Sequence, residues 1–185
     1  IQSMKKLFYL IALVISASAI ATSCGSDDNS WSEYSQWRNA NNLWYLSMKD
    51  SVNANGTPFY TELNPAWLPN SGVLIHYFND RSQTIGNLSP MVTSQVSVKY
   101  KGMLYNGVVF DSTTVNTSDS VRTFGLQSVV TGWRIALTDM RVGDTCEVIL
   151  PYTMGYGAQG QSSISPYSSL KFGIKLVDIP NYEIP

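Results

Sequence analysis

The side chains that could carry out chemistry are few, and they exclude most kinds of active site. His76 is the one histidine, and it follows an apolar run where a structural or surface role is expected, so no Ser-His-Asp arrangement is available. The glycine-rich stretch 155–160 lacks the lysine that follows a phosphate-binding loop. With no cluster of His and Cys either, we expect no metal and no cofactor. What remains is a set of aromatic and branched side chains, with Asp111 and Tyr156 as polar candidates.

Composition and charge narrow the class of protein. The chain has 185 residues, of which 44% are hydrophobic and 14% charged, enough for one folded domain and an extension. The net charge is -1 and basic residues form no block, so a nucleic-acid partner is not expected.

The first residues are typical of an export signal. Basic Met4-Lys5-Lys6 precedes an apolar run from Leu7 to Ile20, which is shorter than the roughly 20 residues needed to span a bilayer. Small residues then lead to Cys24, which resembles a bacterial lipobox. We therefore expect a signal peptide over residues 1–23, a lipidated Cys24 with a tether to residue 30, and a lipid-anchored protein in the bacterial envelope at the outer membrane. The alternative is an ordinary signal peptide with an incidental cysteine.

Residues 31–72 form an aromatic extension with four of the five tryptophans. Apolar residues at steps of three and four predict a helix from Trp31 to about Asp50. Asn53 to Pro69 is rich in Asn, Gly and Pro and is predicted to be a connecting segment that lies against an apolar surface. The helix either packs on the main domain or offers a surface for a homodimer or for client chains.

From Val73 the apolar residues recur with period two, which indicates strands. Apolar positions at steps of three and four predict one short helix within 128–141, ending before Gly143. Cys146 falls in an alternating strand and is read as a small core residue without a disulfide partner. The predicted strands are Val73–Phe78, Val96–Lys101, Val108–Asp111, Val121–Leu126, Cys146–Leu150 and Leu170–Leu176. One short helix against a curved antiparallel sheet is an α+β architecture.

Short stretches in this half resemble one family, the FKBP-type peptidyl-prolyl cis-trans isomerases. They are Gly72–Leu74, Val98–Gly102, Asn106–Ser112, Val129–Trp133, Met140–Asp144, Tyr156–Ala158 and Leu170–Phe172. Each is short, but they occur in the family's order and near its spacing. The resemblance implies an antiparallel half-barrel wrapped around one short helix over residues 73–179, and isomerisation of X-Pro bonds in unfolded or nascent polypeptides.

The same resemblance implies a set of site residues. Trp133 would form the floor of a pocket, Asp111 would stand at its rim, and the Tyr156 hydroxyl and the Val130 N–H would hold peptide carbonyls. The catalytic residues would be Asp111, Tyr156, Trp133 and Phe110, and the substrate-binding residues Tyr100, Val129, Val130, Ile164 and Phe172.

Two positions and one segment differ from the family pattern, and they bear on substrate preference and on macrolide binding. Arg122 stands where an aromatic is usual, Gln161 where many members have a histidine, and Leu126 to Val129 is shorter than usual. The alternatives are therefore a binding or chaperone module with little turnover and, more remotely, a carbohydrate-binding lipoprotein domain.

Overall fold

The computed structural model describes residues 32–113, 120–180 and 182. Tyr34 to Pro185 forms one compact unit. The predicted signal peptide and the lipidation of Cys24 lie outside the described residues. Within them, no helix combines the length and the apolarity that a membrane crossing requires.

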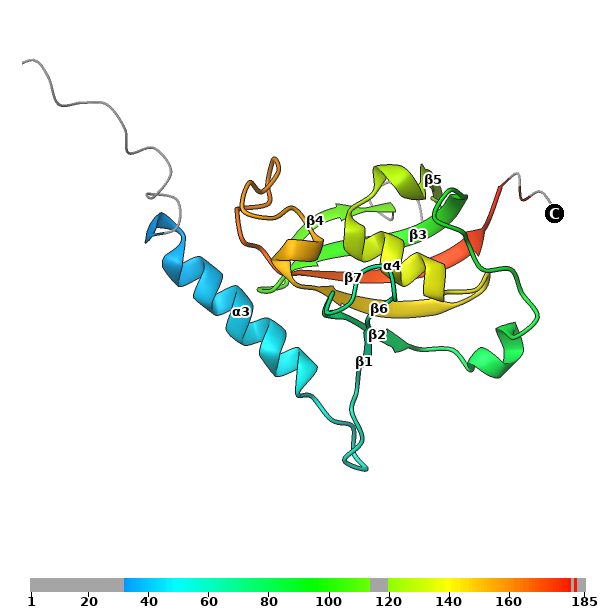
Figure 1. Ribbon diagram of the computed structural model, residues 1–185, viewed down its shortest axis with the longest axis horizontal. Helices are drawn as coiled ribbons and strands as arrows, with labels where there is room; N and C mark the ends of the chain where they lie inside the picture. The colour runs from blue at the N-terminus through cyan, green and yellow to red at the C-terminus, as the bar shows by residue number, and fades with distance from the viewer. Residues whose placement is uncertain (1–31, 114–119, 181, 183–185) are drawn as a thin grey trace, which may run out of the picture. The chain divides into compact units, whose positions relative to one another are not determined.

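One antiparallel sheet dominates the unit (Figure 1). Its path runs β1-β2-β6-β7-β3-β4, and β5 pairs with β3 beside β4. The strands are β1 Thr61–Leu63, β2 Val73–Tyr77, β3 Gln95–Leu104, β4 Val109–Ser112, β5 Arg122–Gly125, β6 Thr145–Leu150 and β7 Leu170–Asp178. The long β3 and β7 pair along their length, so they form the centre that the shorter strands extend.

Helix α4, Thr131–Asp139, lies across one face of the sheet (Figure 1). Alternate residues of each strand point to that face. In β6 these residues are Cys146, Val148 and Leu150, which are fully buried. They pack with Trp133 and other apolar residues of α4 in the main core. Cys146 is thus the small core residue that the sequence indicated, and burial raises the pKa of its thiol.

The other face of the sheet carries helix α3, Ser35–Lys49. Leu74 of β2 and Ile149 of β6 are buried there with Tyr45 of α3 and Tyr60. The Tyr45 hydroxyl also donates a hydrogen bond of 2.7 Å to the carbonyl oxygen of Gly72. The helix therefore packs on the domain, which is the first of the two interpretations made from the sequence. Pairing of two chains through α3 stays a prediction.

The α+β fold predicted from the sequence is confirmed, with one strand added. Asn53 to Pro69 was predicted to be a connecting segment, and the structure shows that β1 lies within it and pairs with β2. A three-residue edge strand of sequence Thr-Glu-Leu has too little alternation to be recognised. The Asn-Gly turn is present as predicted, since Gly107 adopts φ 84° between β3 and β4.

A buried carboxylate joins the end of α4 to the loop after β2. Asp144 is fully buried and accepts hydrogen bonds from Thr84 Oγ1 at 2.7 Å, Asn79 Nδ2 at 3.0 Å and the Arg141 N–H at 2.9 Å. Arg81 Nε lies 3.3 Å from its second oxygen. Burial alone would raise the pKa of Asp144, but these donors and the guanidinium outweigh burial and lower it.

Candidate active site

A cavity of about 400 Å³ opens between the sheet and the N-terminal end of α4. Its walls come from β3, β4, β5, β7, the start of α4 and the loop after β6. The lining residues are Tyr100, Phe110, Asp111, Phe124, Ser128, Val129, Val130, Trp133, Tyr156, Gln161 and Phe172. Segments far apart in the sequence therefore supply one concave surface lined mainly by aromatic and branched side chains.

Trp133 forms the floor of this cavity, with 3% of its surface exposed. Its ring meets those of Tyr100, Phe124 and Phe172 at centroid distances of 5.0, 5.8 and 5.2 Å, all close to perpendicular. Such edge-to-face pairs contribute about 0.5–1.5 kcal/mol each beyond the area they bury. Aromatic rings from three strands therefore hold the Trp133 ring in position.

Phe110 of β4 and Phe172 of β7 form one wall, with ring centroids 5.6 Å apart. Gly102 of β3 lies beneath both rings. A Cβ at Gly102 would lie 2.7 Å from the Phe110 ring and 2.8 Å from the Phe172 ring. Because this position has no side chain, the two rings can close over the strand and complete the wall.

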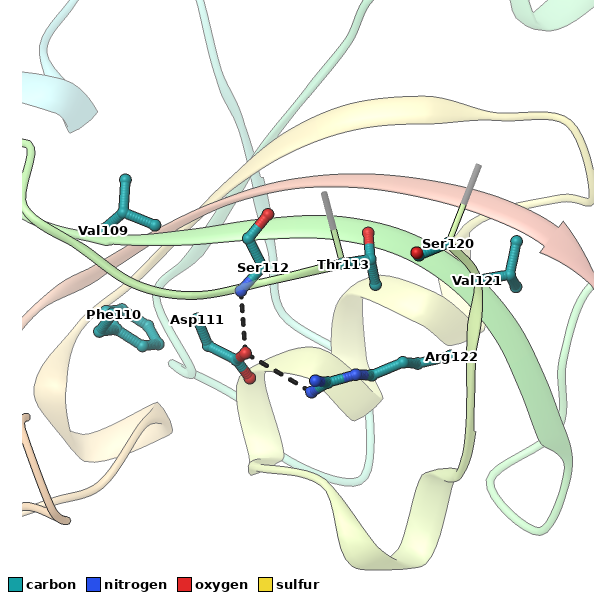
Figure 2. A pocket seen from close by; sticks show the side chains of 8 residues that line it. All are labelled: Val109, Phe110, Asp111, Ser112, Thr113, Ser120, Val121 and Arg122. Carbon is teal, nitrogen blue, oxygen red and sulfur yellow. Dashed lines mark hydrogen bonds and ion pairs between the residues drawn. The ribbon is translucent and has the colours of Figure 1, made fainter. Parts of the chain in front are cut away.

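A polar cluster stands at the rim, where Asp111 follows Phe110 (Figure 2). Tyr100 donates a 2.5 Å hydrogen bond from its hydroxyl to one carboxylate oxygen, and the Ser112 N–H donates to the other at 2.8 Å. Arg122 of β5 lies 3.5 Å from the carboxylate and donates to the Tyr100 hydroxyl at 3.1 Å. Burial, and then the hydrogen bond to Asp111, raise the pKa of Tyr100 to about 12. The carboxylate is thus fixed in orientation.

Two further donors belong to residues that line the cavity, Tyr156 and Val130. The Tyr156 hydroxyl has no hydrogen-bond partner among the residues that the structure describes. Burial, and to a lesser degree the charge of Asp111, raise the pKa of Tyr156, so its hydroxyl stays protonated and can donate. Val130 is the N-cap residue of α4, a position at which backbone N–H groups lack partners within the helix.

The comparisons with known proteins agree with this geometry. A family model described as FKBP-type peptidyl-prolyl cis-trans isomerase matches residues 86–177. This domain belongs to the FKBP family. The peptidyl-prolyl cis-trans isomerase Mip of Coxiella burnetii is 39% identical over 92 residues, which are 49% of this chain and 39% of that protein. The FKBP-type 22 kDa peptidyl-prolyl cis-trans isomerase of Escherichia coli is 38% identical over 91 residues, 49% of this chain and 43% of that protein.

Solved structures extend the likeness in fold. The peptidyl-prolyl cis-trans isomerase of Pseudomonas syringae superposes with a TM-score of 0.63 at 24% identity, covering 86% of this chain and 98% of that one. FkpA of Escherichia coli gives a TM-score of 0.66 at 18% identity, covering 96% and 72%. The matched region spans less than half the length of the relatives from Coxiella burnetii and Escherichia coli.

The FKBP domain brings the predicted site residues together, with one exception. Tyr100, Phe110, Asp111, Val129, Val130, Trp133, Tyr156 and Phe172 all line the cavity. Ile164 does not line it; its side chain is 6% exposed and packs in the core, next to the bridge it forms with Gln161. The catalytic and substrate-binding roles of these residues stay predictions.

Phe124 and Ser128 line the cavity of the FKBP domain but were not among the predicted site residues. Phe124 alternates with Thr123 and Gly125 along a short strand, and this period of two was the available signal. Ser128 ends the 3₁₀ turn Leu126–Ser128, which is the form taken by the shortened segment before α4.

The two departures from the family pattern lie in different places. Gln161 lines the cavity, so it can contact a ligand directly. Arg122 is absent from that lining and borders the neighbouring depression with Asp111 and Val121 (Figure 2). The arginine therefore acts on the site through its contacts with Asp111 and Tyr100.

Proposed function

We propose that this FKBP domain is a peptidyl-prolyl cis-trans isomerase that acts on proline-containing unfolded or nascent polypeptides. The observation that carries the proposal is the aromatic cavity floored by Trp133, which holds only a few polar groups. Its size and apolar walls suit the ring of a prolyl residue. The names of the relatives support the same activity.

The chemistry requires no nucleophile or metal because no covalent bond is broken. Rotation about an X-Pro bond meets a barrier of about 18–20 kcal/mol that arises from amide resonance. The planar amide is more charge-separated than the twisted one, so an apolar cavity disfavours the planar form relative to the twisted form. Contacts that are stronger to the twisted geometry lower the barrier, since only differential stabilisation accelerates a reaction.

Each polar group has a role that follows from its position. The Tyr156 hydroxyl, which has no partner among the described residues, donates to a carbonyl of the peptide. The Val130 N–H donates to a second carbonyl from the start of α4. Asp111 is held by Tyr100 and Arg122, so it contributes a fixed negative potential at the rim and does not need to exchange protons.

A peptide assay tests the proposal. The purified chain should accelerate cis-to-trans exchange of a short X-Pro peptide in proportion to its concentration, against an uncatalysed exchange that takes tens to hundreds of seconds. A peptide with alanine in place of proline should not compete. Exchange no faster than the uncatalysed rate would refute the isomerase proposal. If a chain without isomerase activity still kept an unfolded client protein from aggregating, the alternative function, a binding or chaperone module, would replace the isomerase proposal.

We also propose that the protein is a lipoprotein of the bacterial envelope, anchored through Cys24, where it assists the folding of envelope or secreted proteins. The support is the basic start, the apolar run and the small residues before the cysteine. In a bacterial host, labelled fatty acid should enter the wild-type chain and none should enter a Cys24→Ala variant, which should leave the membrane fraction. Equal labelling of the two proteins would contradict the anchor.

A further inference from the structure

The loop between β6 and β7 carries one side of the proposed isomerase site. It includes Tyr156 and Gln161, both of which line the cavity. Its backbone hydrogen bonds between residues 151 and 167 join one part of the loop to another. One of them joins the Tyr167 N–H to the Gly157 carbonyl at 2.9 Å, directly beside Tyr156. Contacts that fix the position of Tyr167 therefore also help to fix the position of Tyr156.

Helix α3 holds the end of this loop by two side-chain hydrogen bonds. Asn41 is 1% exposed, and its Oδ1 accepts a buried hydrogen bond of 2.8 Å from the Ser169 N–H. Its Nδ2 donates to the carbonyl of Trp37 at 2.9 Å, which fixes the orientation of the amide. One turn earlier, Trp37 Nε1 donates to Ser168 Oγ at 3.2 Å. Both partners lie immediately before β7.

The same helix packs around a strained residue of the loop. Tyr167 adopts φ 61°, which is unusual for a bulky side chain, and only 5% of its surface is exposed. The Arg38 guanidinium lies 5.5 Å from its ring centroid, and the rings of Tyr34 and Tyr152 lie at 6.4 and 5.4 Å. A backbone conformation of this kind persists only when the surrounding structure enforces it. Two of the three groups that enclose it belong to α3 or its N-cap.

We infer that α3 braces the loop and thereby positions Tyr156 and Gln161 at the cavity. Trp37, Asn41 and Arg38 are then positioning residues, because none of them lines the cavity. The inference rests on the proposed isomerase function, since it assigns the helix a role in that same site. It makes the extension part of the active domain, in addition to any role in dimer formation or client binding.

The test compares hydrogen bonds made by two buried residues of α3 that lie one turn apart, Asn41 and Tyr45. Asn41→Ala removes the acceptor of the Ser169 N–H, and Tyr45→Phe removes a bond of similar length to Gly72, which does not line the cavity. In the full chain, Asn41→Ala should reduce hydrogen-exchange protection of the Ser169 amide by roughly tenfold. It should lower kcat/KM for an X-Pro peptide by about fivefold or more, mainly by raising KM. Tyr45→Phe should change the Ser169 protection and kcat/KM by less than about twofold.

A second variant keeps the test valid if Asn41→Ala does not fold. Trp37→Phe removes the indole N–H that donates to Ser168 but keeps an aromatic ring at this position beside Tyr105. It should change the Ser169 protection and kcat/KM in the same direction by a smaller factor. Lost Ser169 protection with unchanged kcat/KM would overturn the brace, and so would equal effects of the Asn41 and Tyr45 variants. If the wild type itself fails to catalyse exchange, the proposed function fails. In that case the hydrogen-exchange protection of the amides of residues 155–169, compared between the wild type and the Asn41 variant, alone decides whether α3 holds the loop.

Discussion

Replacing Phe110 by alanine is expected to lower kcat/KM for an X-Pro peptide by about 10- to 150-fold while the domain stays folded. The ring forms one wall of the cavity with Phe172, so its removal leaves a bound prolyl ring exposed to water on that side. Burial of one such aromatic side chain contributes about 1.5–3 kcal/mol, which gives this range. Because Phe110 is only partly buried in the free domain, its loss should cost less stability than the loss of a core ring.

The neighbouring residue supplies the control for this prediction. Val109 lies on the same strand, is 44% exposed and points away from Phe110 (Figure 2). Val109→Ala removes apolar atoms from the same strand but none from the aromatic cavity, and it should leave kcat/KM within about twofold. A Phe110→Ala chain that matched the Val109→Ala chain in kcat/KM would show that the aromatic wall does not contribute to catalysis.

Replacing Asp144 by alanine should lower the free energy of unfolding by about 3–5 kcal/mol, measured by urea denaturation. The substitution leaves Thr84, Asn79 and the Arg141 N–H without their acceptor, and it leaves Arg81 without the partner of its Nε atom. Such losses are large relative to the total stability of a domain, which is about 5–15 kcal/mol. The cost arises from orphaned donors in a buried position.

An exposed carboxylate provides the contrast. Glu62 pairs with Lys49 at 2.9 Å, but the two side chains are 31% and 42% exposed. Glu62→Ala removes the same charge and should cost about 0–1 kcal/mol. Equal losses for the Asp144 and Glu62 variants would contradict the view that burial sets the difference.

The lowered pKa of Asp144 adds a dependence on pH. Because the carboxylate titrates at lower pH in the folded domain than in the unfolded chain, it stabilises the fold fully above its ordinary pKa of about 3.9. That contribution is lost as the pH falls from there through the lowered folded value. The wild type should therefore lose stability more steeply in this acidic range than Asp144→Ala, which has no such group to protonate.

Features that depend on near neighbours in the chain were readable from the sequence. Alternating apolar residues identified β2, β3, β6 and β7, because side chains of a strand point to its two faces in turn. Spacing of three and four identified α4. The site residues were carried over from the order and spacing of short stretches that resemble the FKBP family, and the structure places all of them except Ile164 at the cavity.

Features that depend on distant partners were decided only by the tertiary structure. The sequence assigned no partner to Asp144, because its donors at Asn79 and Thr84 lie 65 and 60 positions away. Arg122 was a departure without an assigned partner until folding placed it beside Asp111 and Tyr100.

The cavity also combines features that could be predicted from the sequence with features that only the tertiary structure revealed. Its aromatic residues and its two polar candidates, Asp111 and Tyr156, belong to the first kind. The sequence by itself determined which side chains were available and which strands would carry them, because period and local turn chemistry act over a few residues. The tertiary structure alone decided that Asp111 is held by Arg122, that the Tyr156 hydroxyl lacks a partner among the described residues, and that Asn41 of α3 supports the loop beside it. The reason is that each of these features depends on how separate strands, loops and helices pack against one another, which no local sequence pattern specifies.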